Sequence, residues 1–445
     1  MIQSRDPDDP AFAQAIRDQA EATIALRRAL HRHPEVGWTE FRTTALVREA
    51  IEALEPDVVH LGASLYEGVD RLGVPDQEIV AAAMARAIES GVSERDLEAM
   101  EGGLTGLAAD FSGSGPGPVI AIRADLDGLP LSESAAETHY PTRAGFRSEV
   151  DGVMHACGHD AHTAVAIGVA RGLHEVRDRW FGRVRFLFQP AEEGTRGADA
   201  FVRRGLLDDV DIVLTFHILS NVGLAAGEIA PGVSDMLPTE KFVVRFVGAP
   251  SQFASSPERG RNALSAASGV TILAHAIPTR PGSRSMVNIG RLVSGTAANI
   301  VPAAAVLTGE IRSDRMEDVA ELAETFKTLC AGVASGFGVE SAYEVAGYAT
   351  DPRCDAALMD RIAFNGTQAG LVIRDPVSLG ASDDASLMID RVQKRGGVGT
   401  YVAISGGDYH PHHSPDFDID DRILPATVEL LVRSVVDLSA ERSHP

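Results

Sequence analysis

The chain has few cysteines and no long hydrophobic run. Only three of its 445 residues are cysteine, Cys157, Cys330 and Cys354. So few cysteines exclude a disulfide framework and fit a reducing compartment. No uninterrupted apolar stretch is long enough to span a bilayer, and residues 1–10 are acidic and proline-rich, without the apolar core of a signal peptide. We therefore expect a cytoplasmic protein that does not enter the membrane.

Positive charge is also scarce. Forty Lys and Arg residues against 63 Asp and Glu residues give a formal net charge of −23, which argues against a nucleic-acid or anionic-membrane partner. An anionic small molecule is still an acceptable substrate, because a metal or a local arginine can dominate the field inside a pocket. The composition is otherwise that of a globular protein, with 44% hydrophobic residues. At this length two domains are expected.

Potential metal ligands are concentrated in one stretch, Met-His-Ala-Cys-Gly-His-Asp-Ala-His-Thr at 154–163. It holds three histidines and a cysteine, and an apolar helical run follows at 164–173. A helix N-terminus gives such donors rigid support and favours a thiolate. We interpret the stretch as the first half of a metal site. A polar loop with incidental histidines is the alternative.

Further donors follow predicted strands at 118–123, 183–188, 211–216 and 400–404. Open α/β sheets place their sites at such strand ends. Histidines near 31–33 are more typical of packing or turn roles, and strand-end aspartates can instead cap helices. The donors that follow the four strands are Asp125 and Asp127, Glu192 and Glu193, His217, and the cluster of His410, His412 and His413.

A different order of elements occupies residues 237–348. Strands and helices are expected there in the order β-α-β-β-α-β, which is the split ferredoxin-like unit. The predicted fold class is therefore α/β, with a mixed-sheet metallohydrolase catalytic domain at 1–236 and 349–445 and an inserted ferredoxin-like α+β domain between them. Residues 60–105 form a partly helical, acidic elaboration that we expect to cover or shape a cleft.

Five donors recur as candidate ligands, and thiolate, imidazole and carboxylate together suit Zn, Mn, Co or Ni. Two ions about 3.5–4 Å apart could activate a water and polarise a substrate oxygen. Glu192 would stay free beside its ligating neighbour and act as general base and then general acid. A solvated Glu-Glu loop is the alternative. The candidate ligands are Cys157, His159, Glu193, His217 and His413.

These motifs resemble those of the metal-dependent amidohydrolases of the aminoacylase and carboxypeptidase G superfamily. The nearest resemblance is to the branch of hippurate hydrolase, auxin-conjugate hydrolases and p-aminobenzoyl-glutamate hydrolase, and it covers nearly the whole chain. It is carried by the motifs His-Pro-Glu at 33–35, Arg-Ala-Asp-Leu-Asp at 123–127, the stretch at 154–162, Phe-Gln-Pro-Ala-Glu-Glu-Gly at 188–194, Phe-His at 216–217, Asn-Ile-Val-Pro at 299–302 and His-His-Ser-Pro at 412–415.

The resemblance implies a dinuclear site, of Mn or Zn with Co or Ni as alternatives, held by the five candidate ligands. It implies that Glu192 is the general acid/base and that Asp125 and Asp127 lie behind the ligands. Asn299 and Arg312, in the inserted domain, match positions that hold substrate. The inserted domain is also the usual dimerisation surface, so a homodimer is expected.

One position departs from the family pattern. After the first inserted-domain strand, the relatives carry a histidine that reaches the substrate carbonyl oxygen, often across the dimer, whereas this chain has Gln252. Glutamine can donate a neutral hydrogen bond but cannot become a cation. Losing one oxyanion donor costs about 10²–10³ in rate. Amide hydrolysis at this site is therefore either weakened or independent of that donor.

Three functions are compatible with this pattern. The favoured one is hydrolysis of a C–N bond in an aryl-amide or N-acyl amino acid by metal-bound hydroxide. The second is an aromatic-amine aminohydrolase of the 5-nitroanthranilate type, which attacks the ring carbon, releases ammonia and forms no carbonyl oxyanion. The third is a non-catalytic binding protein, which the complete ligand set argues against.

Overall fold

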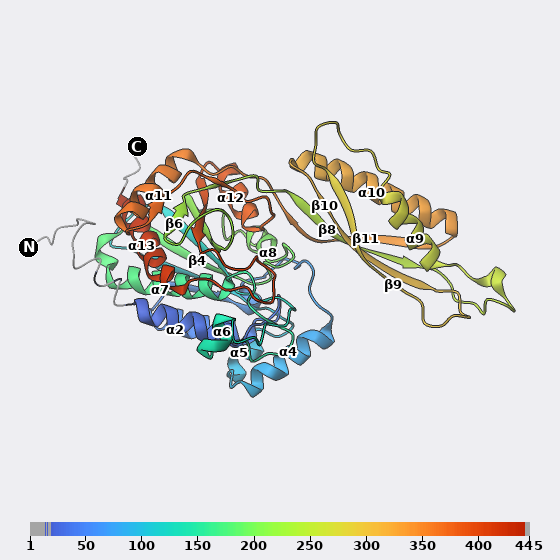
Figure 1. The fold of residues 1–445 in the computed structure, drawn as a ribbon, viewed down its shortest axis with the longest axis horizontal. Helices are drawn as coiled ribbons and strands as arrows, with labels where there is room; N and C mark the ends of the chain where they lie inside the picture. Colours follow the sequence, from blue (N-terminus) through green and yellow to red (C-terminus); the bar gives the residue numbers. More distant parts are fainter. Residues whose placement is uncertain (1–13, 15, 17–18, 441–445) are drawn as a thin grey trace, which may run out of the picture.

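The computed structural model describes residues 14, 16 and 19–440 and has two lobes (Figure 1). One lobe is built on an eight-stranded sheet and the other on a four-stranded sheet. Residues 1–10, on which the absence of a signal peptide was argued, lie outside the described residues. Among the helices that the structure describes, none is long and apolar enough to cross a membrane.

The large sheet has the order β1-β2-β4-β3-β5-β14-β6-β12. Its central strands β4, β3, β5 and β14 are parallel, whereas β1, β2 and β6 pair antiparallel with their neighbours. The sheet is therefore mixed, and β14 from the C-terminal part of the chain completes it. Its strands are β1 Val58–Leu61, β2 Leu107–Ser112, β3 Val119–Asp125, β4 Arg183–Gln189, β5 Ile212–Leu219, β6 Glu228–Ala230, β12 Val372–Ile373 and β14 Val398–Ser405.

Helices cover both faces of this sheet, which explains why its central strands are apolar on both sides. Along β3, Ile120 and Ile122 belong to one hydrophobic cluster and Ala121 to another. The first cluster lies under α2 Ala20–His31, α3 Phe41–Glu52, α7 His159–Glu175, α11 Ala356–Gln368 and α13 Leu424–Ala440, and the second under α8 Ala198–Arg203 and α12 Ala385–Lys394. The short helix α6 spans Tyr140–Ala144, and a separate parallel pair is formed by β7 Val233–Ser234 and β13 Val377–Ser378.

The second lobe is an antiparallel sheet of order β11-β8-β10-β9 with two helices packed on it. Its elements are β8 Thr239–Val247, α9 Ala263–Ala274, β9 Met286–Ser294, β10 Ala304–Arg312, α10 Met316–Phe337 and β11 Glu340–Ala349. This is the predicted β-α-β-β-α-β unit with ferredoxin-like strand order, so the predicted fold class is confirmed. The domain boundaries at 237 and 348 remain a prediction.

Two expected strand ends were placed too early. β3 continues through Asp125, and β5 continues past His217 to Leu219. The reason is the parallel ladder between β5 and β14, which stays in register as far as Leu219 and Ser405. Both side chains consequently emerge from the sheet itself rather than from the loops beyond it.

The elaboration at 60–105 contains α4 Gln77–Glu89 and α5 Glu94–Ala99, which pack on Phe41 of α3. The connection before α4 contacts residues 191–197, which we call the Glu192 loop. Arg196 in this loop donates from Nη1 to the Gly73 carbonyl (2.9 Å) and from Nε to the Glu193 carbonyl (2.9 Å). On its other side, the N–H of Tyr348 at the end of β11 donates to the Thr195 carbonyl (2.9 Å). The Glu192 loop is thus held between the elaboration and the inserted domain.

Candidate metal centre

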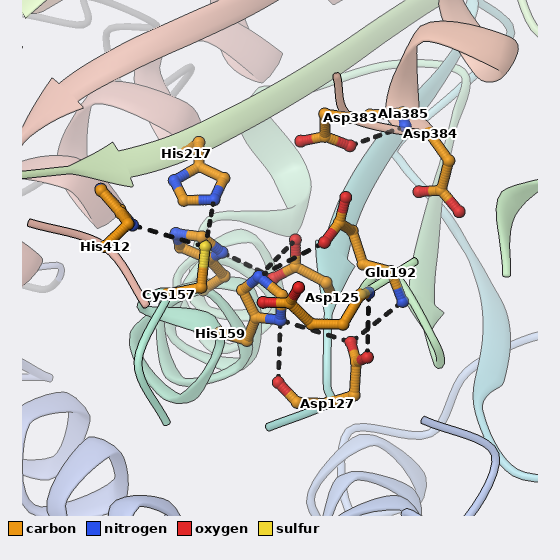
Figure 2. A network of polar contacts seen from close by, with 12 residues as sticks. Asp125, Asp127, Cys157, His159, Glu192, His217, Asp383, Asp384, Ala385 and His412 are labelled. Atoms are coloured by element: carbon orange, nitrogen blue, oxygen red, sulfur yellow. Dashed lines mark hydrogen bonds and ion pairs between the residues drawn. The ribbon is translucent and has the colours of Figure 1, made fainter. Parts of the chain in front are cut away.

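The candidate ligands gather around a cavity of about 270 Å³ that is bordered by both lobes. His159 is the first residue of α7, directly after Gly158 (φ 89°). Glycine adopts this left-handed conformation without strain, and the turn brings the Cys157 thiol to the helix N-terminus. Figure 2 shows Cys157, His159, His217 and Glu192 facing a common space. The cavity is lined by, among others, Cys157, Glu192, Glu193, His217, Lys241, Arg312, Asp383, Tyr401, His412 and His413.

Two sets of donor atoms converge here. Cys157, Glu193 and His413 form one group, and His159 and His217 belong to the other. The Sγ atom of Cys157 lies 3.5 Å from Nε2 of His217, so the sulfur lies next to both groups. The structure therefore brings all five predicted ligands together.

The polar atoms of these residues fit a cation. Nε2 of His159 is buried and has no hydrogen-bond partner among the described residues. Oε1 of Glu193 lies 3.2 Å from Nε2 of His413 yet makes no hydrogen bond with it. Burial raises the pKa of the Cys157 thiol, so a nearby positive charge is needed to hold the thiolate. A divalent cation between these atoms would satisfy each of these groups.

Asp127 holds the ligands from behind. Nδ1 of His159 donates to the Asp127 carbonyl (2.8 Å), which leaves Nε2 facing the cavity. The Asp127 carboxylate accepts from the backbone N–H groups of Glu192 and Glu193, each at 3.0 Å. One side chain therefore orients parts of both ligand groups, as outer-shell partners of metal ligands commonly do.

The third histidine of the helical motif is not available as a ligand. Nδ1 of His162 donates to Oδ1 of Asp125 (2.6 Å), and its Nε2 accepts from the N–H of Ile218 (2.8 Å). Both ring nitrogens are therefore used. Asp125 in turn binds Nη1 of Arg123 through its second oxygen (2.6 Å), so it lies behind the ligands in the place predicted for it.

A buried group of charges surrounds Glu192. Nη2 of Arg123 lies 3.2 Å from Asp383 and 3.1 Å from Asp384, and the hydroxyl of Tyr401 donates to Asp383 (2.8 Å). Burial, together with the negative charge of Asp383, raises the pKa of Glu192 well above its ordinary value. A carboxyl group with this property can both accept and return a proton near neutral pH.

The sequence interpretation missed Asp383, Asp384 and Tyr401. An adjacent pair of aspartates before a helix usually lies in solvent, so the pair itself gave no signal. The usable signal was Arg123, because an arginine inside a strand that reads Val-Ile-Ala-Ile-Arg requires buried carboxylates. Arg123 is fully buried.

The His-His-Ser-Pro turn gives its two histidines different partners. Nε2 of His412 accepts from the N–H of Ser220 (2.9 Å), so its Nδ1 carries the proton and donates to Cys157 Sγ (3.4 Å). His413 has a φ of 62°, which is unusual for a residue with a side chain and is typical of functional sites. The turn therefore presents His413 to Glu193 and uses His412 to orient the sulfur.

The predicted substrate-binding residues are divided. Arg312 lines the cavity, whereas Asn299 and Gln252 are exposed and do not. The two lie beside each other, because the N–H of Phe253 donates to the Asn299 carbonyl (3.1 Å). The connection between β8 and α9, which contains Gln252, lies at the end of the inserted domain that points away from the catalytic lobe (Figure 1).

A buried ion-pair network supports the N-terminus of α7. Asp160, next to His159, accepts from Nε of Arg27 and from Nδ1 of His31, both at 2.8 Å. Nε2 of His31 lies 3.0 Å from Glu133. His31 therefore has a structural role, as the sequence favoured, and is not a metal ligand.

This network predicts a pH dependence of stability. Burial opposes protonation of His31, but its hydrogen bonds to Asp160 and Glu133 raise its pKa from 6.5 to about 9. The proton therefore stabilises the folded state fully below pH 6.5, and this contribution is lost as the pH rises through 9. We expect a loss on the order of 2–3 kcal/mol.

The measurement is urea unfolding of EDTA-treated protein between pH 6 and 9.5, followed by fluorescence of Trp38 and Trp180, which lie in the catalytic lobe. The part of the pH dependence due to His31 is the difference between wild type and His31→Gln, with the exposed His275→Gln as control. Parallel curves for wild type and His31→Gln would contradict the prediction.

The fold and the donor set define a metal-dependent hydrolase with a ferredoxin-like insert. The chain belongs to peptidase family M20/M25/M40, whose model matches residues 121–437. It is 36% identical over 436 residues to indole-3-acetyl-aspartic acid hydrolase of Enterobacter agglomerans, covering 97% of this chain and 99% of the relative. It is also 36% identical over 428 residues to one of the polypeptides of p-aminobenzoyl-glutamate hydrolase from Escherichia coli (strain K12), covering 95% and 97%.

Solved structures agree with these relatives. An aminobenzoyl-glutamate utilization protein from Klebsiella pneumoniae has a TM-score of 0.82 at 32% identity, over 97% of this chain and 100% of that one. A dinuclear metal-binding peptidase of the M20 family from Bacillus subtilis has a TM-score of 0.62 at 25% identity, over 97% and 99%. The resemblance drawn from the motifs and the prediction of a metal-dependent amide-hydrolysing enzyme are thereby confirmed.

Proposed function

We propose that the chain hydrolyses the amide bond between an aromatic or acyl group and an amino acid, as part of the breakdown of aromatic compounds in the cytoplasm. The observation that carries the proposal is the convergence of five donors with a buried, non-ligating Glu192 beside them. The two relatives named above act on conjugates of this kind, indole-3-acetyl-aspartate and p-aminobenzoyl-glutamate. We propose Mn or Zn as the ions, since the mixed N, S and O donors suit both.

In this proposal Cys157, His159, Glu193, His217 and His413 hold two divalent cations. When bound, these ions make a water molecule more acidic and polarise the substrate carbonyl. Glu192, whose Oε2 lies 3.9 Å from Nε2 of His159, accepts a proton from the attacking water. It then donates that proton to the nitrogen of the leaving amino acid. Arg312 holds an anionic group of the substrate at the other side of the cavity.

We further propose a homodimer formed through the inserted domain. Asn299 and Gln252 lie outside the cavity of their own chain, so they can act on substrate only in the cavity of a second copy. Oε1 of Gln252 accepts from the N–H groups of Ala254 and Ser255 (2.7 and 2.5 Å). Its amide nitrogen is therefore the end that is free to donate to a substrate oxygen.

Gln252 also supports a second candidate, the aromatic-amine aminohydrolase. Attack on an electron-poor ring carbon places the negative charge in the ring and not on a carbonyl oxygen, so a cationic donor is dispensable. The same ligands and Glu192 would serve this reaction, with ammonia as the leaving group.

A product assay on Mn-loaded protein separates the two reactions. We expect free amino acid from p-aminobenzoyl-glutamate or related N-acyl amino acids, and no ammonia from 5-nitroanthranilate. Gln252→His should then raise amide hydrolysis by about 10- to 100-fold, because it restores a cationic oxyanion donor. Gln368→His, on the exposed end of α11, is the matched control. Ammonia from 5-nitroanthranilate, with the conjugates inert, would establish the second reaction.

A further inference from the structure

Two basic side chains of the inserted domain line the cavity opposite the metal ligands. They are Lys241, near the start of β8, and Arg312, at the end of β10. The two strands are antiparallel neighbours, with Lys241 paired to Glu310 and Thr239 paired to Arg312. Side chains two residues apart, or directly paired, share one face of a sheet. Lys241, Glu310 and Arg312 therefore project from the same face at the edge of the cavity.

The positive charge of Arg312 is already compensated. Its Nε lies 3.0 Å from Oε1 of Glu310, and its Nη2 donates to Oε2 at 3.1 Å. This bidentate pair carries no net charge, but it leaves the remaining guanidinium N–H groups as oriented donors. Arg312 can thus fix the direction of a carboxylate without giving a strong preference for charge.

Lys241 is different, because its ammonium group has no carboxylate partner within the described part of the chain. It is half-buried and lines the same cavity as Cys157 and Glu193. In a chain with a net charge of −23, an uncompensated lysine in a cavity is a strong local attraction for an anion. Most of the other cavity-lining charges, including Glu192 and Asp383, are negative.

We propose that Lys241 is a specificity-determining residue that binds a second carboxylate of the substrate, and that the substrate class is amide conjugates of acidic amino acids. Arg312 orients one carboxylate, and Lys241 supplies the charge that selects for the other. This inference rests on the proposed amide hydrolysis and names the substrate class for the same cavity. Conjugates of neutral amino acids lack a partner for Lys241 and are poorer substrates.

The test compares p-aminobenzoyl-glutamate with p-aminobenzoyl-glutamine, which differ only in the side-chain carboxylate. Wild type should prefer the glutamate conjugate by about 10- to 100-fold in kcat/KM, the range of a charge-assisted hydrogen bond. Lys241→Gln should lose this preference, mostly through a higher KM for the glutamate conjugate. Lys241→Arg should keep most of it. Arg245→Gln, on the same strand but exposed and outside the cavity lining, is the matched control.

Binding gives a readout that does not depend on turnover. Both conjugates are titrated calorimetrically into Mn-loaded Glu192→Gln protein with and without Lys241→Gln. Equal losses for both conjugates, or an unchanged preference, would overturn the role of Lys241. Absence of product from either conjugate with wild type would instead contradict the proposed function, so the two failures are distinguishable.

Discussion

Glu192→Gln is expected to lower kcat by about 10³- to 10⁴-fold while the protein keeps its full metal content. Glutamine has the size of glutamate and can take its place beside His159, but it cannot accept the proton of the attacking water. Glu192 is buried, and burial together with Asp383 raises its pKa well above the ordinary value. The proton that it accepts is therefore held long enough to be passed to the leaving nitrogen.

The measurement pairs single-turnover rates with metal analysis of the same preparation. Glu175→Gln, an exposed carboxylate at the last turn of the ligand-bearing helix α7, is the control and should behave as wild type. Turnover within a few-fold of wild type would remove Glu192 from the role of general base. Loss of metal together with activity would show that Glu192 is a ligand and not a free base.

Cys157→Ala is expected to lose at least one equivalent of metal and, with it, more than 10³-fold in activity. The sulfur belongs to the group of Glu193 and His413 and lies 3.5 Å from Nε2 of His217 in the other group. Its removal therefore takes a donor from the place where the two groups meet. Metal binding to the folded state alone also stabilises it, so the thermal shift on adding Mn or Zn should shrink as well.

Metal content after dialysis against a buffered metal solution tests this prediction directly. Cys330→Ala is the matched control, because Cys330 is buried in the core of the inserted domain, away from the cavity. It should retain full metal with only a modest loss of stability. Stoichiometric metal in Cys157→Ala would exclude the sulfur from the ligand set.

The inserted domain could be predicted in detail because its pattern is local. Alternating apolar residues and two well-spaced amphipathic helices indicate the order of elements, and the observed bounds differ from the expected ones by only a few residues. The ligands were also visible, since histidine and cysteine in one helical turn rarely occur without a reason. Both signals depend on residues that are close together in the sequence.

What could not be predicted depends on distant contacts. Asp383 meets Arg123 across 260 residues, and a pair of aspartates alone looks like a solvated turn. His217 was placed beyond its strand because the length of β5 depends on pairing with β14. The exposed positions of Asn299 and Gln252 relative to the cavity likewise follow from the tertiary arrangement of the inserted domain.

The contacts of the Glu192 loop have a thermodynamic consequence. Tyr348 holds Thr195 from the inserted domain, and Arg196 connects the Glu193 carbonyl to Gly73. A rotation of the inserted domain about its connections must therefore move the backbone that carries a metal ligand. Binding of a molecule that bridges Lys241 and the metals is then coupled to metal affinity, and by reciprocity each ion that binds favours the domain orientation that the substrate prefers.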